Sequence, residues 1–277
     1  MFTIYNEDCL RTMERMCEEG QKVDVVLTSP PYNISRGVST EEEISKHKSK
    51  YKDFRDNLPN EEYRAFIVNV VNHYDNVLND NGAVLFNVSY ASCVETDSRC
   101  SDMIKLMYDI VLKTNFDIAD IITWKKKSAL PNNRSSNKLT RIVEYVFVLC
   151  RKEEYSTFKC NKKLVSFNED KNLRFYENVF NFVEAKNNDG TNELNKATYS
   201  EELCEKLLSM YAQPNSIIYD SFNGTGTTGV AALKLGHTYI GSEISTEQCE
   251  FSIKRLQSVV GNFNESHPTN TSCVTLW

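Results

Sequence analysis

The sequence predicts an α/β protein with a doubly wound, mainly parallel sheet, and three observations favour this fold class. Short apolar, β-branched runs alternate with segments of helical periodicity along the chain. Two prolines stop one such strand within the stretch Leu27–Asn33, and a glycine-rich turn follows another strand at Asp220–Gly229. Open α/β sheets bind ligands at the carboxyl ends of their strands, so we expect both turns to contribute to one site.

Seven segments have the apolar pattern of strands, and they cover residues 2–5, 23–27, 83–88, 116–124, 142–150, 216–220 and 237–243. Helical spacing of apolar residues marks residues 9–19, 60–78, 102–113, 198–211 and 230–235. Thr198 and Glu201 have the spacing of a capping box. Residues 35–60 are polar and without periodicity, which predicts a lid or a DNA-contacting loop.

Composition excludes several classes of protein. A chain of 277 residues with 40% hydrophobic residues fits one large domain, or one domain with an insertion. It has no apolar run long enough to span a bilayer and no signal peptide at its N-terminus, so we expect a soluble, intracellular protein. The nine cysteines form no paired motif and the four histidines lie far apart, so neither a metal site nor a disulfide framework is expected.

Positive charge is concentrated in one part of the chain. Residues 124–174 contain 13 lysines and arginines against 5 acidic residues, a net charge of +8, whereas the rest of the chain carries −14. A segregated basic segment is typical of a phosphate-binding surface. We therefore expect DNA contacts from Lys125, Lys126, Lys127, Arg134 and Lys138. The alternative is a solvated polar insertion.

The proline corner has the groups needed to bind a flat molecule that carries an amino group. The Ser29 hydroxyl and the carbonyls beside Pro30 and Pro31 can accept hydrogen bonds, and the Tyr32 ring can stack. The alternative is a Pro-Pro turn with a buried tyrosine, and the isolated motif does not decide between them.

The glycine-rich turn favours a nucleoside that lacks a phosphate. No Lys-Ser or Lys-Thr follows it, so it is not a Walker loop, and the acid Asp220 would repel a pyrophosphate. About 20 residues further on, Glu243 ends the next strand and is placed to accept hydrogen bonds from a ribose diol. A cationic nucleoside such as S-adenosyl-L-methionine fits these charges.

Together, Thr28-Ser-Pro-Pro-Tyr32 and Asp220-Ser-Phe-Asn-Gly-Thr-Gly-Thr-Thr228 with Glu243 resemble the amino-group DNA methyltransferases of the β arrangement. In that family the catalytic motif comes first, the target-recognition region second and the donor motif last, which is the order found here. The resemblance covers about residues 3–258. It implies a seven-stranded, circularly permuted Rossmann-like methyltransferase sheet with a small target-recognition insertion. The expected division is 1–150 and 196–260 for the two halves of one domain, 151–195 for the insertion and 261–277 for a tail.

The resemblance also implies roles for individual residues. Ser29, Pro30, Pro31 and Tyr32 would be catalytic, with the target base flipped from the duplex, stacked on Tyr32 and held through its amino group by Ser29 and the Pro30 carbonyl. S-adenosyl-L-methionine would be bound by Asp8, Cys9, Thr28, Ser200, Asp220, Phe222, Asn223, Gly224, Gly226, Thr227 and Glu243. No metal is implied. Val143 departs from the family pattern, because we expect histidine before Glu144-Tyr145.

The target base and the partners follow from the resemblance alone. Thr-Ser-Pro-Pro-Tyr resembles the cytosine-N4 signature, whereas Asn33 after the tyrosine is common among adenine-N6 enzymes, so cytosine is favoured and adenine is the alternative. The expected partner is double-stranded DNA, with a homodimer and a cognate restriction endonuclease as further possibilities. More remote alternatives are an RNA or protein methyltransferase and a catalytically silent DNA-binding subunit.

Overall fold

The computed structural model describes residues 1–33, 58–89, 100–128, 142–161, 163–167, 174–177, 181–191 and 198–266. Most of the 35–60 segment, together with Arg134 and Lys138, lies outside the described residues. Within the described ranges, no helix combines the length and the apolar character needed to cross a membrane.

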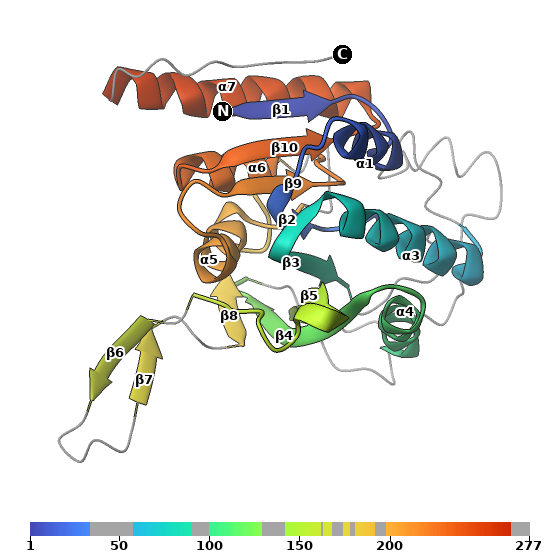
Figure 1. The fold of residues 1–277 in the computed structure, drawn as a ribbon. Coiled ribbons are helices and arrows are strands. Elements are labelled where there is room, and N and C mark those ends of the chain that lie inside the picture. Colours follow the sequence, from blue (N-terminus) through green and yellow to red (C-terminus); the bar gives the residue numbers. More distant parts are fainter. Residues whose placement is uncertain are drawn as a thin grey trace.

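One large sheet forms the centre of the molecule (Figure 1). Its strands are β1 (Phe2–Tyr5), β2 (Val23–Thr28), β3 (Leu78–Val88), β4 (Phe116–Lys126), β5 (Val143–Arg151), β8 (Phe182–Ala185), β9 (Ile217–Asp220) and β10 (Thr238–Ser242). They lie in the order β1-β10-β9-β2-β3-β5-β4-β8. Seven of these strands were expected from the sequence. The expected count of seven is wrong by one, because β8 adds an eighth strand at the edge beside β4.

The pairing directions place five carboxyl ends at one edge of the sheet. Strands β1, β10, β9, β2 and β3 are successively parallel, whereas β5 is antiparallel to both β3 and β4. Parallel strands require crossover connections, which the helices supply. The chain segments that leave β1, β2, β9 and β10 therefore emerge together.

Helices cover both faces of the sheet (Figure 1). One core is formed by the sheet with α1 (Cys9–Glu18), α3 (Asn60–Val77) and α4 (Cys100–Lys113). The other core is formed with α5 (Glu201–Tyr211), α6 (Thr227–Lys234) and α7 (Thr246–Ser266). The strands between these layers are buried on both sides, which explains why they read as continuous apolar runs.

The region predicted as a target-recognition insertion contributes to two sheets. After the short 3-10 turn η1 (Lys152–Glu154), strands β6 (Lys163–Phe167) and β7 (Arg174–Glu177) form a separate antiparallel hairpin. Figure 1 shows this hairpin projecting from the body of the molecule. The next strand, β8, returns to the central sheet.

Most helix ends lie within two residues of the sequence prediction, but the starts of α5 and α6 differ more, and α7 was not predicted. The capping box at Thr198 is wrong, because Ser200 caps α5 and accepts a hydrogen bond from Leu203 N at 3.2 Å. Helix α6 begins at Thr227, three residues earlier than predicted, directly after the left-handed Gly226. Helix α7 continues to Ser266, so the first residues of the predicted tail are helical.

Candidate active site

A cavity lies at the carboxyl ends of β1, β2, β9 and β10, where the sequence predicts a ligand site. Its lining includes apolar side chains, carboxylates and backbone of the glycine-rich turn: Glu7, Asp8, Cys9, Ser29, Pro31, Phe66, Thr198, Tyr199, Asp220, Ser221, Phe222, Asn223, Gly224, Thr225, Thr227, Ser242, Glu243, Ile244, Ser245 and Gln248. The proline corner and the glycine-rich turn therefore line one cavity, as expected from the parallel register of β2 and β9.

The proline corner is fixed at both ends by hydrogen bonds. The Tyr63 hydroxyl on α3 donates to the Pro31 carbonyl at 2.8 Å. Asn33 has a left-handed φ of 44°, and its side chain exchanges two hydrogen bonds of 2.8 Å with the backbone of Leu58. A left-handed conformation suits asparagine better than most residues. Asn33 thus joins the two chain segments that flank residues 34–57.

The Tyr32 hydroxyl lies in a buried group of polar side chains, which we call the Tyr32 cluster: Ser29, Tyr32, Asn87, Lys126 and Glu144. Tyr32 lies 3.0 Å from Ser29 Oγ, 2.8 Å from Asn87 Nδ2 and 3.2 Å from Glu144 Oε2. Lys126 Nζ pairs with Glu144 Oε1 at 2.5 Å. Three further strands, β3, β4 and β5, therefore support the corner that follows β2.

The Asp220 carboxylate joins the corner to the glycine-rich turn. It is 1% exposed and accepts four hydrogen bonds, two at each oxygen, from Thr28 Oγ1, Phe222 N, Tyr199 Oη and Thr228 Oγ1. Burial raises the pKa of Asp220, while these hydrogen bonds oppose that rise. Because its acceptor sites are occupied by the chain, Asp220 shapes the cavity by positioning other groups.

Glu243 holds the tip of the glycine-rich turn. Its carboxylate accepts hydrogen bonds from Gly224 N at 2.7 Å and Ser245 N at 2.8 Å. At Gly226, whose φ is +80°, a Cβ would also lie only 3.0 Å from the Ser252 Cβ on α7. Glycine therefore allows the turn to pass close to α7 and to enter α6 at once.

The turn between β1 and α1 supplies another side of the cavity. Asp8 is the N-cap of α1 and accepts a hydrogen bond from Leu10 N at 2.8 Å. Cys9 is buried behind it, and burial raises the pKa of its thiol. Asn6 donates to the carbonyl of Glu243 at 2.8 Å, which ties the ends of β1 and β10 together.

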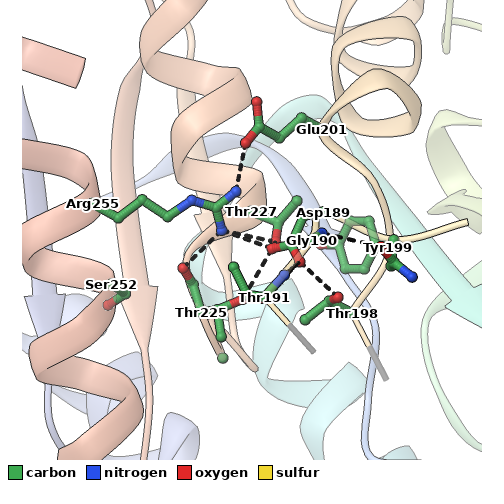
Figure 2. A network of polar contacts seen from close by, with 12 residues as sticks. Asp189, Gly190, Thr191, Thr198, Tyr199, Glu201, Thr225, Thr227, Ser252 and Arg255 are labelled. Carbon is green, nitrogen blue, oxygen red and sulfur yellow. Dashed lines mark hydrogen bonds and ion pairs between the residues drawn. The ribbon is translucent and has the colours of Figure 1, made fainter. Parts of the chain in front are cut away.

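Asp189 forms a second polar hub behind the glycine-rich turn (Figure 2). Its side chain is fully buried and accepts hydrogen bonds from Thr191, Thr198, Thr225 and Thr227, and from Arg255 Nη1 at 2.7 Å. Burial would raise its pKa, but the hydrogen bonds, led by those from Thr191 and Thr227, outweigh burial and hold the pKa well below its usual range. Arg255 Nη2 also pairs with Glu201 at 2.5 Å.

Five predicted site residues do not line the cavity. Thr28, Pro30, Tyr32 and Gly226 adjoin lining residues in the sequence, and Thr28 and Tyr32 contact lining residues through hydrogen bonds. Ser200 is 1% exposed and its hydroxyl caps α5, whereas its neighbours Thr198 and Tyr199 line the cavity. Its predicted contact with the donor therefore has no support in this geometry.

The three described lysines of the predicted DNA surface all form ion pairs within the chain. Lys125 pairs with Glu184 at 2.7 Å, and Lys127 pairs with Glu202 at 2.5 Å. Lys126 belongs to the Tyr32 cluster and also lies 4.9 Å from the centre of the Trp124 ring. Lys126 therefore supports the proline corner, while Lys125 and Lys127 remain predicted DNA contacts.

Sequence reasoning missed several residues of the site. Glu7 and Ser245 line the cavity beside predicted residues, and adjacency to Asp8 and Glu243 was the available signal. Asp189 had no such signal, because it follows β8 in a segment assigned to the insertion. Among the described residues, no group of His, Cys, Asp and Glu is arranged to hold a metal ion.

Comparison with known proteins identifies the family. The N6/N4 methyltransferase family model, described as DNA methylase, matches residues 23–255. Type II methyltransferase M2.MboI of Moraxella bovis is 25% identical over 273 residues, which cover 93% of this chain and 88% of that protein.

Two solved structures have the same fold. The crystal structure of an M1.HpyAVI–SAM complex gives a TM-score of 0.62 at 22% identity and covers 92% of this chain and 99% of that one. PvuII DNA methyltransferase, described as cytosine-N4-specific, gives a TM-score of 0.64 at 16% identity, with coverage of 95% and 93%. Because the family model spans most of the sequence, the chain belongs to the N6/N4 DNA methylase family and is a DNA methyltransferase.

Proposed function

We propose that this protein transfers a methyl group from S-adenosyl-L-methionine to the exocyclic N4 of cytosine in a specific duplex DNA sequence. One observation carries the proposal: Ser29, whose hydroxyl is a neutral hydrogen-bond acceptor, lines the same cavity as Phe222, Gly224 and Glu243. The acceptor for a base amino group thus lies beside a nucleoside-binding loop. Methyl transfer needs these two binding functions in one place.

The cavity lining fits the proposed donor. Phe66, Phe222 and Ile244 offer apolar surface for an adenine ring, and the two phenylalanine rings meet edge to face at 6.3 Å. Asp8 and Glu243 provide negative charge for a cationic ligand and acceptors for ribose hydroxyls, whereas the Glu7 carboxylate is paired with Arg15. When bound, S-adenosyl-L-methionine supplies an electrophilic methyl group on a positively charged sulfur.

The chain's own contribution to the chemistry is orientation. Ser29 Oγ and the Pro30 carbonyl accept the two amino hydrogens, which directs the nitrogen lone pair toward the donor side of the cavity. As the amino nitrogen bonds to the methyl carbon, the methyl–sulfur bond of the donor would break, the sulfur would leave as a neutral thioether with that electron pair, and the nitrogen would release one proton to water. Stacking of the flipped base on Tyr32 stays part of the proposal, as predicted from the sequence, although Tyr32 is 7% exposed and does not line the cavity. None of the buried cysteines is needed as a nucleophile.

Adenine N6 is the alternative target. Asn33 follows the tyrosine, as in many adenine enzymes, and here it is buried and fixed to Leu58 rather than aimed at the cavity. A serine accepts from either base amino group, so the preference for cytosine rests on the likeness of Thr28–Tyr32 to the cytosine signature.

A dissection of donor binding and turnover tests the proposal. Labelled S-adenosyl-L-methionine is incubated with unmethylated duplex DNA and the intact protein, and label in the DNA is counted. Ser29→Ala removes the acceptor, so we expect turnover to fall about 100-fold with little change in the donor Kd. Tyr32→Ala is expected to behave in the same way. Retained turnover in both variants, with donor binding intact, would contradict the proposed roles.

Glu243→Ala serves as the reciprocal variant. It releases Gly224 and removes a ribose acceptor, so we expect the donor Kd to rise about 10-fold or more. The two substitutions therefore separate the donor side of the cavity from the base side. A homodimer and a cognate restriction endonuclease remain proposals, which sedimentation analysis and genomic context would test.

A further inference from the structure

The Tyr32 cluster contains more polar contacts than a stacking residue needs. Tyr32 is 7% exposed, and its hydroxyl lies between Ser29, Asn87 and Glu144 at the ends of three different strands. Glu144 is 9% exposed and pairs with Lys126. A phenylalanine would provide the same ring for stacking, so the hydroxyl needs its own explanation.

With the Asn87 amide oriented so that its NH2 faces this cluster, and its buried Oδ1 without a partner among the described residues, one arrangement of protons satisfies the contacts of Tyr32 with Asn87 and Glu144. A carboxylate paired with a lysine only accepts hydrogen bonds, and an amide NH2 only donates them. Asn87 Nδ2 lies 3.2 Å from Glu144 Oε2 and 2.8 Å from the Tyr32 oxygen, so it donates to both. Tyr32 has one proton, and its acceptor is Glu144 Oε2 at 3.2 Å.

The contact between Ser29 and Tyr32 then has a fixed direction. The single Tyr32 proton is already used, so the 3.0 Å contact is a hydrogen bond only if Ser29 donates to the Tyr32 oxygen. Asn87 Nδ2 also approaches Ser29 Oγ at 3.3 Å as a donor. With its own proton directed at Tyr32 and one lone pair facing Asn87, Ser29 Oγ keeps one further lone pair, and Ser29 belongs to the cavity lining.

We propose that Glu144 is a positioning residue that acts through the Tyr32 hydroxyl to hold Ser29 as a hydrogen-bond acceptor for the amino group of the target base. This inference rests on the proposed function. A free serine hydroxyl rotates and can turn its proton toward the substrate. The chain Ser29→Tyr32→Glu144 removes that freedom. Lys126 completes the chain, because its ammonium group compensates the buried negative charge.

A double-mutant cycle on the intact protein tests the coupling. The variants are Tyr32→Phe, Glu144→Gln and the combination of both, and the measurements are kcat and the KM values for DNA and donor. Because a hydrogen bond to a charged group is broken, we expect each single substitution to lower kcat about 10- to 100-fold, with KM for the donor unchanged. The double variant is expected to match the slower single variant.

The matched control is Asp109→Asn. Asp109 is also a partly buried carboxylate with two cationic partners, Arg64 and Lys113, but these lie on α3 and α4. It should lose stability without losing kcat. Melting temperatures of all variants identify any general loss of folding, and Tyr32→Phe keeps the ring, so it tests the chain even if Glu144→Gln folds poorly.

The outcomes separate this inference from the proposed function. A wild-type kcat in Tyr32→Phe would overturn the inference, because stacking alone would then explain Tyr32. The inference would also be overturned if Glu144→Gln lowered kcat by the same factor in the unsubstituted protein and in the Tyr32→Phe variant. Glu144 would then act independently of the Tyr32 hydroxyl, as a structural partner of Lys126. If the unsubstituted protein binds the donor but transfers no methyl group to DNA, the proposed function fails and the inference fails with it.

Discussion

Replacement of Asp189 by asparagine should weaken both the fold and the donor site. The Asp189 carboxylate accepts from two groups that can only donate: Thr191 N at 3.0 Å at one oxygen, and Arg255 Nη1 at 2.7 Å at the other (Figure 2). The threonine hydroxyls around it can rotate to accept. The NH2 group of an asparagine would have to face either Thr191 N or Arg255 Nη1. Both of these groups are donors, so that buried hydrogen bond would be replaced by two donors facing each other.

The size of the effect follows from those contacts. The loss of a buried hydrogen bond to a charged group costs about 2–3 kcal/mol. In a domain of this size each kcal/mol lowers the melting temperature by about 2 °C, so we expect a fall of about 4–6 °C. Thr225 and Thr227, whose hydroxyls donate to Asp189, lie in the glycine-rich turn. The donor Kd should therefore rise as well.

Thermal and urea unfolding, with calorimetry for donor binding, measure both effects. Glu184→Gln is the control, because it breaks the exposed ion pair with Lys125 and should cost less than about 1 kcal/mol. If Asp189→Asn stays within about 0.5 kcal/mol of the unsubstituted protein, the reasoning about obligatory donors is refuted.

At low pH, the unsubstituted protein and Asp189→Asn should become more similar in free energy of unfolding. The pKa of Asp189 in the folded state lies below the ordinary value of 3.8. Between these two pKa values the unfolded state binds more protons than the folded state, so the free energy of unfolding rises with pH. The contribution of Asp189 is complete above pH 3.8 and is lost as the pH falls toward the folded-state pKa. The gap in free energy of unfolding between the unsubstituted protein and Asp189→Asn should therefore narrow below about pH 4. A gap that stays constant to pH 2.5 would contradict this.

Three further substitutions have expected outcomes. Gly229→Ala places a Cβ 2.5 Å from Tyr239 Cε1, so unfolding experiments should show a loss of about 1–3 kcal/mol. Asn33→Ala removes both hydrogen bonds to Leu58 and should lower stability by about 2 kcal/mol, whereas Asn33→Gly removes the same two hydrogen bonds but tolerates the left-handed φ and should cost less. Tyr199→Phe removes a donor from buried Asp220, so the donor Kd measured by calorimetry should rise, and an unchanged Kd would exclude that coupling.

The central strands could be predicted because burial on both faces gives them continuous apolar sequences. The eighth strand could not, because β8 has only four residues at the edge of the sheet and Phe182 in it is half exposed. Its pairing with β4 joins residues about 60 positions apart, and no local pattern encodes that contact.

The site could be predicted where its residues follow strand ends. Ser29, Asp220 and Glu243 each come directly after a strand or end one, so the parallel order of β2, β9 and β10 brings them together. The supporting residues Glu144 and Asp189 could not be assigned in this way. Glu144 reads as part of a strand, and its role depends on Tyr32, 112 positions away.

The net charge of residues 124–174 does not show which of their cationic side chains are available to bind DNA. Lys126 and Arg151 both belong to this segment, and both are internal: Lys126 supports the Tyr32 cluster, and Arg151 pairs with Asp75 and Glu154 at 9% side-chain exposure. Their acidic partners come from other strands and helices or from the following turn. Composition therefore overstates the positive charge that this segment offers to DNA.

The most direct test of the central claim is mass spectrometry of nucleosides from unmethylated duplex DNA treated with the protein and labelled S-adenosyl-L-methionine. We expect labelled N4-methylcytosine, and we expect the label to be lost in Ser29→Ala. Labelled N6-methyladenine would preserve the geometry of Ser29 and Tyr32 but contradict the proposed base. The absence of label from DNA, with donor binding intact, would contradict the proposed reaction.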